Sequence, residues 1–300
     1  MTSQVTASPG PGHGPARRLA VWLHAHRRTQ LWLLLAAPLA WLGLVYLGSL
    51  AILLLNAFWE TDAFSGRVVP TFSLDAFRQL LTVEVYRTVA LRTIGMAVAV
   101  TLTDIVLAFP IAYYMARVAS TRTRAIMLIA VLMPLWASYL VKIYAWRVIL
   151  QGNGLLDWLL EPFGISGPGL NQVANSWIVL SYLWLPYMIL PVYAGLERIP
   201  TSLLEASADL GGRAGSTFRR VIVPLVVPSI VAGSIFTFSL TLGDYITPTM
   251  VSGTKFIGNV IYDNSSLGSL PLAAAYSFVP IVIMIGYLLI ARRLGAFESL

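Results

Sequence analysis

Long runs of apolar residues, separated by shorter polar stretches, make up most of this 300-residue chain. A helix needs about 20 apolar residues to cross the hydrocarbon core of a bilayer, which is about 30 Å thick. Six stretches reach or approach that length: 31–59, 93–116, 125–141, 173–196, 221–243 and about 270–291. The pattern therefore predicts an all-α polytopic membrane protein with six transmembrane helices.

The first apolar stretch needs a comparison with a signal peptide, because arginines precede it. Its run is far longer than the 7–15 residues of a signal-peptide core, and no small-residue cleavage site follows it. We therefore expect a tail at 1–30, a transmembrane domain at 31–292 and a second tail at 293–300. Residues 1–16 are rich in glycine, proline and serine without periodicity, which predicts disorder.

The distribution of basic residues predicts the orientation. With the N-terminus inside, the inner segments hold thirteen arginines and the outer segments hold seven arginines and lysines. Basic residues gather on the cytoplasmic side of membrane proteins. Both termini are therefore expected in the cytoplasm, together with the polar loop at about 198–224 that separates the fourth and fifth helices.

Composition excludes several classes of function. Hydrophobic residues make up 57% of the chain, charged residues 11%, and the mean hydropathy is +0.76, so the chain lacks the polar surface of a soluble globule. It has no cysteine, and its three histidines lie in the N-terminal tail, so disulfides and a histidine or cysteine metal site are not expected. The net charge of +7 is explained by membrane orientation rather than by nucleic acid.

The polar loop has the chemistry of two short helices separated by glycine. Ser202 stands three positions before Glu205, which is the spacing of a capping box and predicts the start of a helix. Gly211 and Gly212 would end that helix. A second short helix is expected at about 216–220.

Two interpretations of this loop are open from its local chemistry. Asp209 and Arg213 are four positions apart and would form an ion pair on a helix. A compact helix of this kind would present a rigid surface to another protein. Alternatively, with the help of Arg219 and Arg220, it would rest on lipid headgroups as an amphipathic helix.

The stretch EASADLGGRAGSTFRRVIVP at 205–224 resembles the EAA loop of ABC-importer permeases, whose pattern is E-A-A, three residues, G, nine residues and I-x-L-P. The matching positions here are Glu205-Ala206-Ser207, then Gly211, then Val221-Ile222-Val223-Pro224. The departures are Ser207 for the second alanine, Val221 for isoleucine and Val223 for leucine. The spacing agrees throughout, which favours the family over a headgroup helix.

The resemblance implies that residues 205–211 form a coupling helix that docks in a groove of a separate ATPase subunit. The residues to which it assigns this coupling are Glu205, Ala206, Ser207, Asp209, Gly211 and Pro224. The chain has no G-x-x-x-x-G-K-[ST] sequence. It is therefore expected to be a transport subunit rather than an enzyme, without a cofactor of its own, while ATP and Mg bind to the partner ATPase.

Further stretches are similar to permeases for spermidine and putrescine, and the basic N-terminus resembles the PotB-like first permease of such systems. These stretches are SYLVKIYAW (138–146), GNGLLD (152–157), LPYMILPVYAGLERIP (185–200), LGDYITP (242–248) and IGNVIYD (257–263). The resemblance implies the MetI-like fold of an ABC type I importer in the bacterial inner membrane. It also implies three kinds of partner: an ATPase dimer, a second homologous permease and an extracytoplasmic solute-binding protein.

A polyamine is a flexible polycation, so its path should offer carboxylates and aromatic faces. The candidate pathway residues are Asp104, Asp244, Tyr245, Trp136, Tyr139, Trp184 and Tyr187. Asp104 is the one acid within an otherwise apolar span, where it could instead bond to Thr101 or Thr103. Asp244 follows the fifth span and could instead cap a helix.

Other functions remain open at this stage. The solute could be an amino-acid derivative, sulfate or iron, although an importer of anions would favour basic residues in mid-membrane, which are not seen. An ion-coupled secondary carrier often shows inverted repeats, and no convincing repeat is present. The sequence does not say whether the permease partner is a homologue or a second copy.

Overall fold

The computed structural model describes residues 27–62, 66–151, 154–155, 158, 161–163 and 172–293. The predicted disorder at 1–16, the stretch GNGLLD in large part, and the tail after Arg293 lie outside these residues. The chain divides into two compact units, Met1–Leu55 and Asn56–Leu300.

The described part of the first unit is one apolar helical segment. It consists of α2 (Arg27–Ala40), the π-helix η1 (Trp41–Leu47) and α3 (Gly48–Leu55). Most of its described large apolar side chains are exposed; Leu44, for example, is 78% exposed. This exposure suits a helix whose solvent is lipid.

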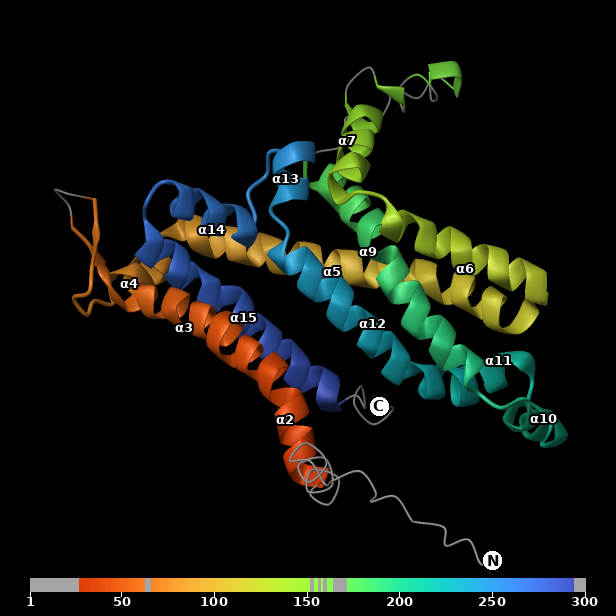
Figure 1. Ribbon diagram of the computed structural model, residues 1–300. Coiled ribbons are helices and arrows are strands. Elements are labelled where there is room, and N and C mark those ends of the chain that lie inside the picture. The colour runs from red at the N-terminus through yellow and green to blue at the C-terminus, as the bar shows by residue number, and fades with distance from the viewer. Residues whose placement is uncertain are drawn as a thin grey trace, which may run out of the picture. The chain divides into compact units, whose positions relative to one another are not determined.

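The second unit contains all the remaining elements (Figure 1). Before the fourth predicted span they are η2 (Asn56–Phe58), β1 (Glu60–Thr61), β2 (Val68–Val69), α4 (Asp75–Thr82), α5 (Glu84–Tyr113), η3 (Tyr114–Val118), α6 (Thr121–Trp136), α7 (Tyr139–Leu150) and η4 (Glu161–Phe163). The rest are α9 (Gln172–Glu197), α10 (Thr201–Asp209), α11 (Ala214–Thr217), η5 (Phe218–Ile222), α12 (Val223–Gly243), α13 (Ile246–Val251), α14 (Ile257–Ser266) and α15 (Leu270–Arg293). β1 and β2 form a small antiparallel pair in which Glu60 faces Val69 and Thr61 faces Val68.

Five helical segments of the described chain are long and apolar enough to cross a membrane. They are Leu34–Phe58, Glu84–Val118, Val173–Glu197, Ala214–Gly243 and Leu270–Arg293. A sixth crossing is possible if α6 and α7, which meet at an angle of 95°, are counted as one span. Five of the six predicted spans are therefore continuous helices in the described chain, and the sixth corresponds to the bent pair of α6 and α7.

The third span, predicted at 125–141, is interrupted near its end. The backbone is extended at Ala137 and Ser138, which ends α6 and starts α7 in a new direction. The ammonium group of Lys142 turns back and donates a hydrogen bond to the carbonyl oxygen of Pro134 at 3.0 Å. The bend therefore leaves a free carbonyl at the end of α6, and a cation from α7 satisfies it.

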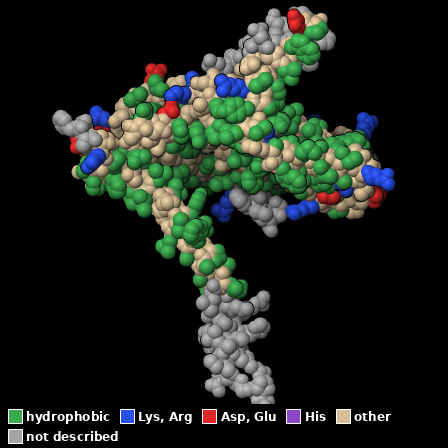
Figure 2. All heavy atoms as spheres, turned by 45° about the horizontal axis from the view of Figure 1, so that its top comes forward, with side chains coloured by type: hydrophobic (Ala, Val, Ile, Leu, Met, Phe, Trp, Pro, Cys, Tyr) green, Lys and Arg blue, Asp and Glu red, His purple; other side chains and the backbone are tan. Residues whose placement is uncertain are grey.

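The core of the second unit is formed by α5, α9 and α12, which pack against one another (Figure 1). Small residues permit the close approach of α9 and α12. A Cβ atom added at Gly195 would lie 2.2 Å from Oγ of Ser229, and one added at Gly233 would lie 2.9 Å from Sδ of Met188. Figure 2 shows that hydrophobic side chains cover most of the face in view, while charged side chains lie toward its edges.

Candidate functional site

The polar loop folds as two short helices, α10 and α11, between the ends of α9 and α12. Pro200 occupies the position before α10 and makes no side-chain cap, so the predicted capping box of Ser202 and Glu205 does not form. The helix begins at Thr201, two residues earlier than that box requires, which places Ser202 inside the first turn. The glycine break is confirmed, because α10 ends at Asp209 and Gly211 has a φ of 76°.

The predicted ion pair of Asp209 with Arg213 is wrong. Among the described residues Asp209 and Arg213 form no ion pair with each other, whereas Arg124 pairs with Glu197 and Lys255 with Asp263. The left-handed conformation of Gly211 ends the helix before Arg213 is reached. The two side chains therefore lack the continuous helical turn that pairs residues four apart.

Three contacts close the loop into a compact unit. The backbone N–H of Gly211 donates to the carbonyl of Ala208, and that of Gly212 donates to the carbonyl of Ser207, both at 2.8 Å. The hydroxyl of Ser207 lies 2.8 Å from the hydroxyl of Thr217 on α11. Ser207, a departure from the family pattern, therefore joins the two helices to each other.

The outer surface of α10 combines acidic and apolar side chains. Glu205, Ala206 and Asp209 are exposed, and Leu210 at the tip is 89% exposed. Pro224 is also exposed, in the first turn of α12. A short helix with a free apolar tip has the form of an element that inserts into a groove of another protein.

The second region of interest surrounds Asp244, which is buried between α12 and α13. Its Oδ1 accepts hydrogen bonds from the N–H groups of Ile246 and Thr247, at 2.9 and 3.1 Å. Its Oδ2 accepts from the hydroxyls of Thr247 and Tyr139, at 2.7 and 2.5 Å. The carboxylate thus caps α13 and also ties α13 to the first residue of α7.

Aromatic rings continue from Asp244 into the core. Tyr139 stacks against Trp184 with ring centroids 6.1 Å apart, and Trp184 is 6.0 Å from Tyr187. Tyr187 in turn stacks on Phe236 of α12 at 6.5 Å. The structure therefore joins three predicted aromatic residues into one line that starts at Asp244.

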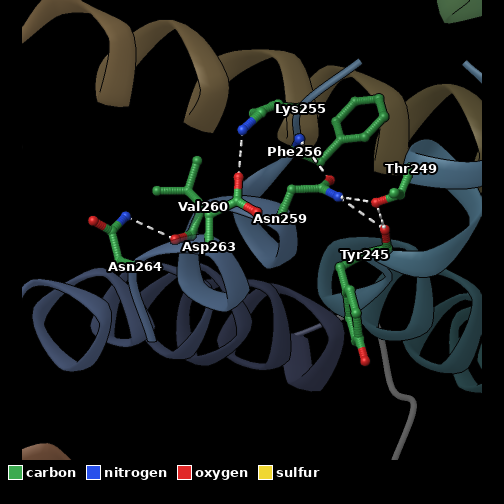
Figure 3. A network of polar contacts seen from close by, with 8 residues as sticks. All are labelled: Tyr245, Thr249, Lys255, Phe256, Asn259, Val260, Asp263 and Asn264. Atoms are coloured by element: carbon green, nitrogen blue, oxygen red, sulfur yellow. Dashed lines mark hydrogen bonds and ion pairs between the residues drawn. The ribbon is translucent and has the colours of Figure 1, made fainter. Parts of the chain in front are cut away.

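Tyr245 is adjacent to Asp244 in the sequence, but its ring stacks on Tyr262 of α14, with centroids 4.8 Å apart. The two rings line a cavity of about 290 Å³. Figure 3 shows Asn259 of α14 donating to the carbonyl of Tyr245 and to the hydroxyl of Thr249, at 2.8 and 2.6 Å. In the same view Lys255 pairs with Asp263, so the loop before α14 is held to that helix.

Asp104 is fully buried in α5, and neither of its carboxylate oxygens has a hydrogen-bond partner among the described residues. The hydroxyls of Thr101 and Thr103 donate to the carbonyls of Ala97 and Ala99. The alternative in which these threonines bond to Asp104 is therefore not observed.

Neighbouring layers of the core show where Asp104 lies along α9. Val100 shares a cluster with Trp184, and Ala108 shares one with Met188. The residue numbers rise together along both helices, so α5 and α9 run in the same direction. The indole N–H of Trp177 donates to the hydroxyl of Thr103 at 3.1 Å, which places the residue before Asp104 beside that part of α9. The indole N–H of Trp184 is also buried without a partner among the described residues.

Trp136 is not brought into this region. It is the last residue of α6 and is 90% exposed. The residues that sequence reasoning missed are Thr247, Asn259, Tyr262 and Phe236. Thr247 had a local signal, because a threonine three residues after an aspartate often belongs to a helix cap, whereas the others required the tertiary structure.

Within the described residues, no group of three or more histidine, aspartate or glutamate side chains could hold a metal ion. The polar groups of the region instead suit a ligand that is bound through a carboxylate and aromatic faces.

Comparison with known proteins gives the following matches. Residues 104–297 match the family model described as "Binding-protein-dependent transport system inner membrane component". The chain is 47% identical over 286 residues to the inner membrane ABC transporter permease protein YdcU of Escherichia coli (strain K12), covering 90% of this chain and 91% of the relative. It is 32% identical to the spermidine/putrescine transport system permease protein PotB of Salmonella typhimurium (strain SL1344), covering 84% and 89%.

The fold is also similar to a solved structure. A bacterial ABC transporter involved in the import of the acidic polysaccharide alginate has a chain that matches with a TM-score of 0.66. The match covers 91% of this chain and 99% of that chain at 19% identity, so it bears on the fold alone.

Proposed function

Because this chain belongs to the binding-protein-dependent transport system inner membrane components, the permease subunits of ABC importers, we propose that it forms the pathway for a polyamine such as spermidine or putrescine. The chain is a transport subunit of the inner membrane and not an enzyme. Membership of an ABC permease family also removes the ion-coupled secondary carrier as an alternative.

The observation that carries the choice of solute is the line of side chains from Asp244 through Tyr139 and Trp184 to Tyr187. A cation–π contact between an aromatic face and an alkylammonium group contributes about 0.5–2 kcal/mol to binding, depending on how far the cation is desolvated. Asp244 has all its hydrogen bonds inside the protein, so a passing cation would replace the hydroxyl of Tyr139 at Oδ2. Asp104, on α5 four residues after Val100, which shares a cluster with Trp184, would supply a second carboxyl group to the path.

The transport cycle requires partners that this chain lacks. In this proposal an ATPase dimer drives transport, and a second homologous permease forms the other half of the pathway. An extracytoplasmic binding protein delivers the solute. ATP binding would close the ATPase dimer and move α10, and the permease pair would then change between outward-facing and inward-facing states.

In this proposal α10 is the coupling helix. Its exposed Leu210 and its acidic side chains would lie in a groove of the ATPase, and the glycine turn after Asp209 would keep the helix compact. Pro224 would fix the direction in which α12 leaves the loop.

The solute is tested by uptake of labelled spermidine and putrescine into vesicles that hold the complete complex, with and without the binding protein. Saturable uptake that needs ATP and the binding protein would support the proposal. Uptake of an amino-acid derivative, sulfate or iron in place of both polyamines would overturn it.

Coupling is tested separately with Glu205→Ala and Gly211→Ala. Both variants should weaken association with the ATPase and lower ATP-dependent uptake. Normal association and normal uptake in both variants would show that α10 is not the coupling helix.

A further inference from the structure

The loop that carries α10 is continuous with α9 on one side and with α12 on the other, yet it also contacts a third helix at both of its ends. That third helix is α5, together with its π-helical extension η3. The two contacts are called here the polar joint and the aromatic joint.

The polar joint lies between η3 and the end of α9. Arg117 donates two hydrogen bonds through Nη2, to the carbonyl oxygens of Leu196 at 2.6 Å and of Ile199 at 2.8 Å. Pro200 has no N–H group, so the carbonyl of Leu196 lacks the donor that would continue the α-helix and accepts a longer bond of 3.3 Å from the N–H of Ile199. A guanidinium group at this point satisfies both carbonyls and also complements the negative end of the α9 dipole.

Arg124 of α6 strengthens the same joint from the side. Its Nε donates to the carbonyl of Met115 at 3.1 Å, and its Nη1 lies 3.3 Å from Oε1 of Glu197. Arg124 therefore connects η3 to the last residue of α9, immediately before the loop begins.

The aromatic joint lies between η5 and α5. The ring of Phe218 meets the ring of Phe109 edge-on, with centroids 5.5 Å apart, and the ring of Tyr113 at 6.4 Å. Phe109 and Tyr113 stack on each other one turn apart along α5, with centroids 6.3 Å apart. Phe218 follows α11 directly, so this joint stands at the downstream end of the loop.

Both joints are carried by π-helical segments. Arg117 belongs to η3 and Phe218 belongs to η5. Single turns of π-helix within α-helices occur often at functional sites, because the extra residue turns a side chain to a position that a regular helix would not give it. Here η3 directs Arg117 toward the end of α9, and η5 directs Phe218 toward α5.

We propose that Arg117 and Phe218 are positioning residues that pass the displacement of α10 to α5, so that α5 moves with the coupling loop as one body. The inference rests on the proposed role of α10 as the coupling helix. Its consequence is that a displacement of α10 by the ATPase would also move α5, the helix that carries Asp104.

The test uses the complete complex and two variants, Arg117→Gln and Phe218→Ala. Transport of labelled spermidine per ATP hydrolysed should fall about fivefold or more, which is the lower range of typical coupling between sites. ATPase association should remain normal, because neither side chain lies on the outer surface of α10. Arg117→Lys keeps the charge but loses the planar guanidinium group that donates to two carbonyls. Its transport per ATP hydrolysed should fall between that of the wild type and that of Arg117→Gln.

Matched controls separate coupling from general damage. Arg122→Gln removes an exposed arginine in the first turn of α6, five residues after Arg117, and Leu225→Ala removes an exposed apolar side chain near η5. Both should behave as the wild type. A proportional loss of ATP hydrolysis and transport in Arg117→Gln, with an unchanged ratio, would mean a purely structural role and would overturn the proposal.

A second measurement needs no solute. The chain has no cysteine, so Val118→Cys on η3 and Ser202→Cys on α10 can carry spin labels in the full complex. Their separation should stay constant between the nucleotide-free and ATP-bound states, and it should change with nucleotide once Arg117→Gln is added. A label separation that changes with nucleotide in the chain that keeps Arg117 would refute the proposal that α5 and the loop move as one body.

The two proposals can fail separately. If Glu205→Ala and Gly211→Ala leave association and uptake normal, the coupling role of α10 is wrong. If those variants fail while Arg117→Gln and Phe218→Ala keep the wild-type ratio, the joints alone are wrong.

Discussion

The hydroxyl of Tyr139 donates a hydrogen bond of 2.5 Å to Oδ2 of Asp244, although the two residues are 105 positions apart in the chain. This bond joins the broken third span to the cap of α13. It also places a carboxylate at the end of the aromatic line formed by Tyr139, Trp184 and Tyr187. One contact thus serves both the packing of the helices and the proposed path of the solute.

Replacing Tyr139 by phenylalanine removes this bond and keeps the ring. Hydrogen bonds to charged groups contribute about 1.5–3 kcal/mol, so Tyr139→Phe should lower the free energy of unfolding by that amount. Denaturant unfolding in detergent measures the change. Tyr144→Phe, at an exposed position of the same helix, is the control, and equal stability of the two variants would contradict the prediction.

Replacing the carboxyl group of Asp104 by an amide should separate its cost to folding from its use in transport. Both carboxylate oxygens are buried without partners among the described residues, so Asp104→Asn should raise the free energy of unfolding by about 1 kcal/mol or more. Spermidine uptake should fall about tenfold, which corresponds to roughly 1.4 kcal/mol of lost interaction with a cation.

The control for Asp104→Asn is Asp75→Asn, the same change at an exposed acid of α4. Normal uptake together with raised stability in Asp104→Asn would remove Asp104 from the pathway.

The second glycine of the loop should tolerate no side chain. A Cβ atom at Gly212 would lie 2.5 Å from the carbonyl oxygen of Ser207, so Gly212→Ala must displace the backbone of the loop. Overpacking of this kind costs about 1–3 kcal/mol. ATP-dependent uptake should therefore be lost in large part, while Gly215→Ala, which meets open space, should behave as the wild type.

Ser207 and Thr217 should show a measurable coupling energy. Their hydroxyls are 2.8 Å apart, and a neutral hydrogen bond contributes about 0.5–1.5 kcal/mol. A double-mutant cycle of Ser207→Ala and Thr217→Val, read by hydrogen exchange of the α10 amides, gives this value. Strictly additive effects would mean that the two helices are not joined through these side chains.

At the close crossing of α9 and α12, one substitution should lower stability and a second one should restore it. Gly195→Ala would place a Cβ atom 2.6 Å from Cβ of Ser229, and it should lower the free energy of unfolding by about 1–3 kcal/mol. Ser229→Gly in the same chain should restore most of that loss. If the double variant is no more stable than Gly195→Ala, the clash lies elsewhere.

Local properties of the sequence were sufficient for the positions of the apolar spans and for the place of the loop that carries α10. The length of an apolar run decides whether a helix can cross a bilayer, and five uninterrupted spans were found where the runs predicted them. Gly211 ended α10 as predicted, because a positive φ is a property of the residue itself. The capping box failed because a spacing alone does not say which residue begins the helix.

The tertiary structure decided everything that depends on distant partners. The break between α6 and α7, the bond of Asp244 to Tyr139 and the isolation of Asp104 all follow from how the helices pack. The same holds for Arg117, whose acceptors are 79 and 82 positions away. An apolar helix has many faces of similar hydrophobicity, so its sequence determines that it enters the membrane, while packing between helices determines which polar groups meet inside.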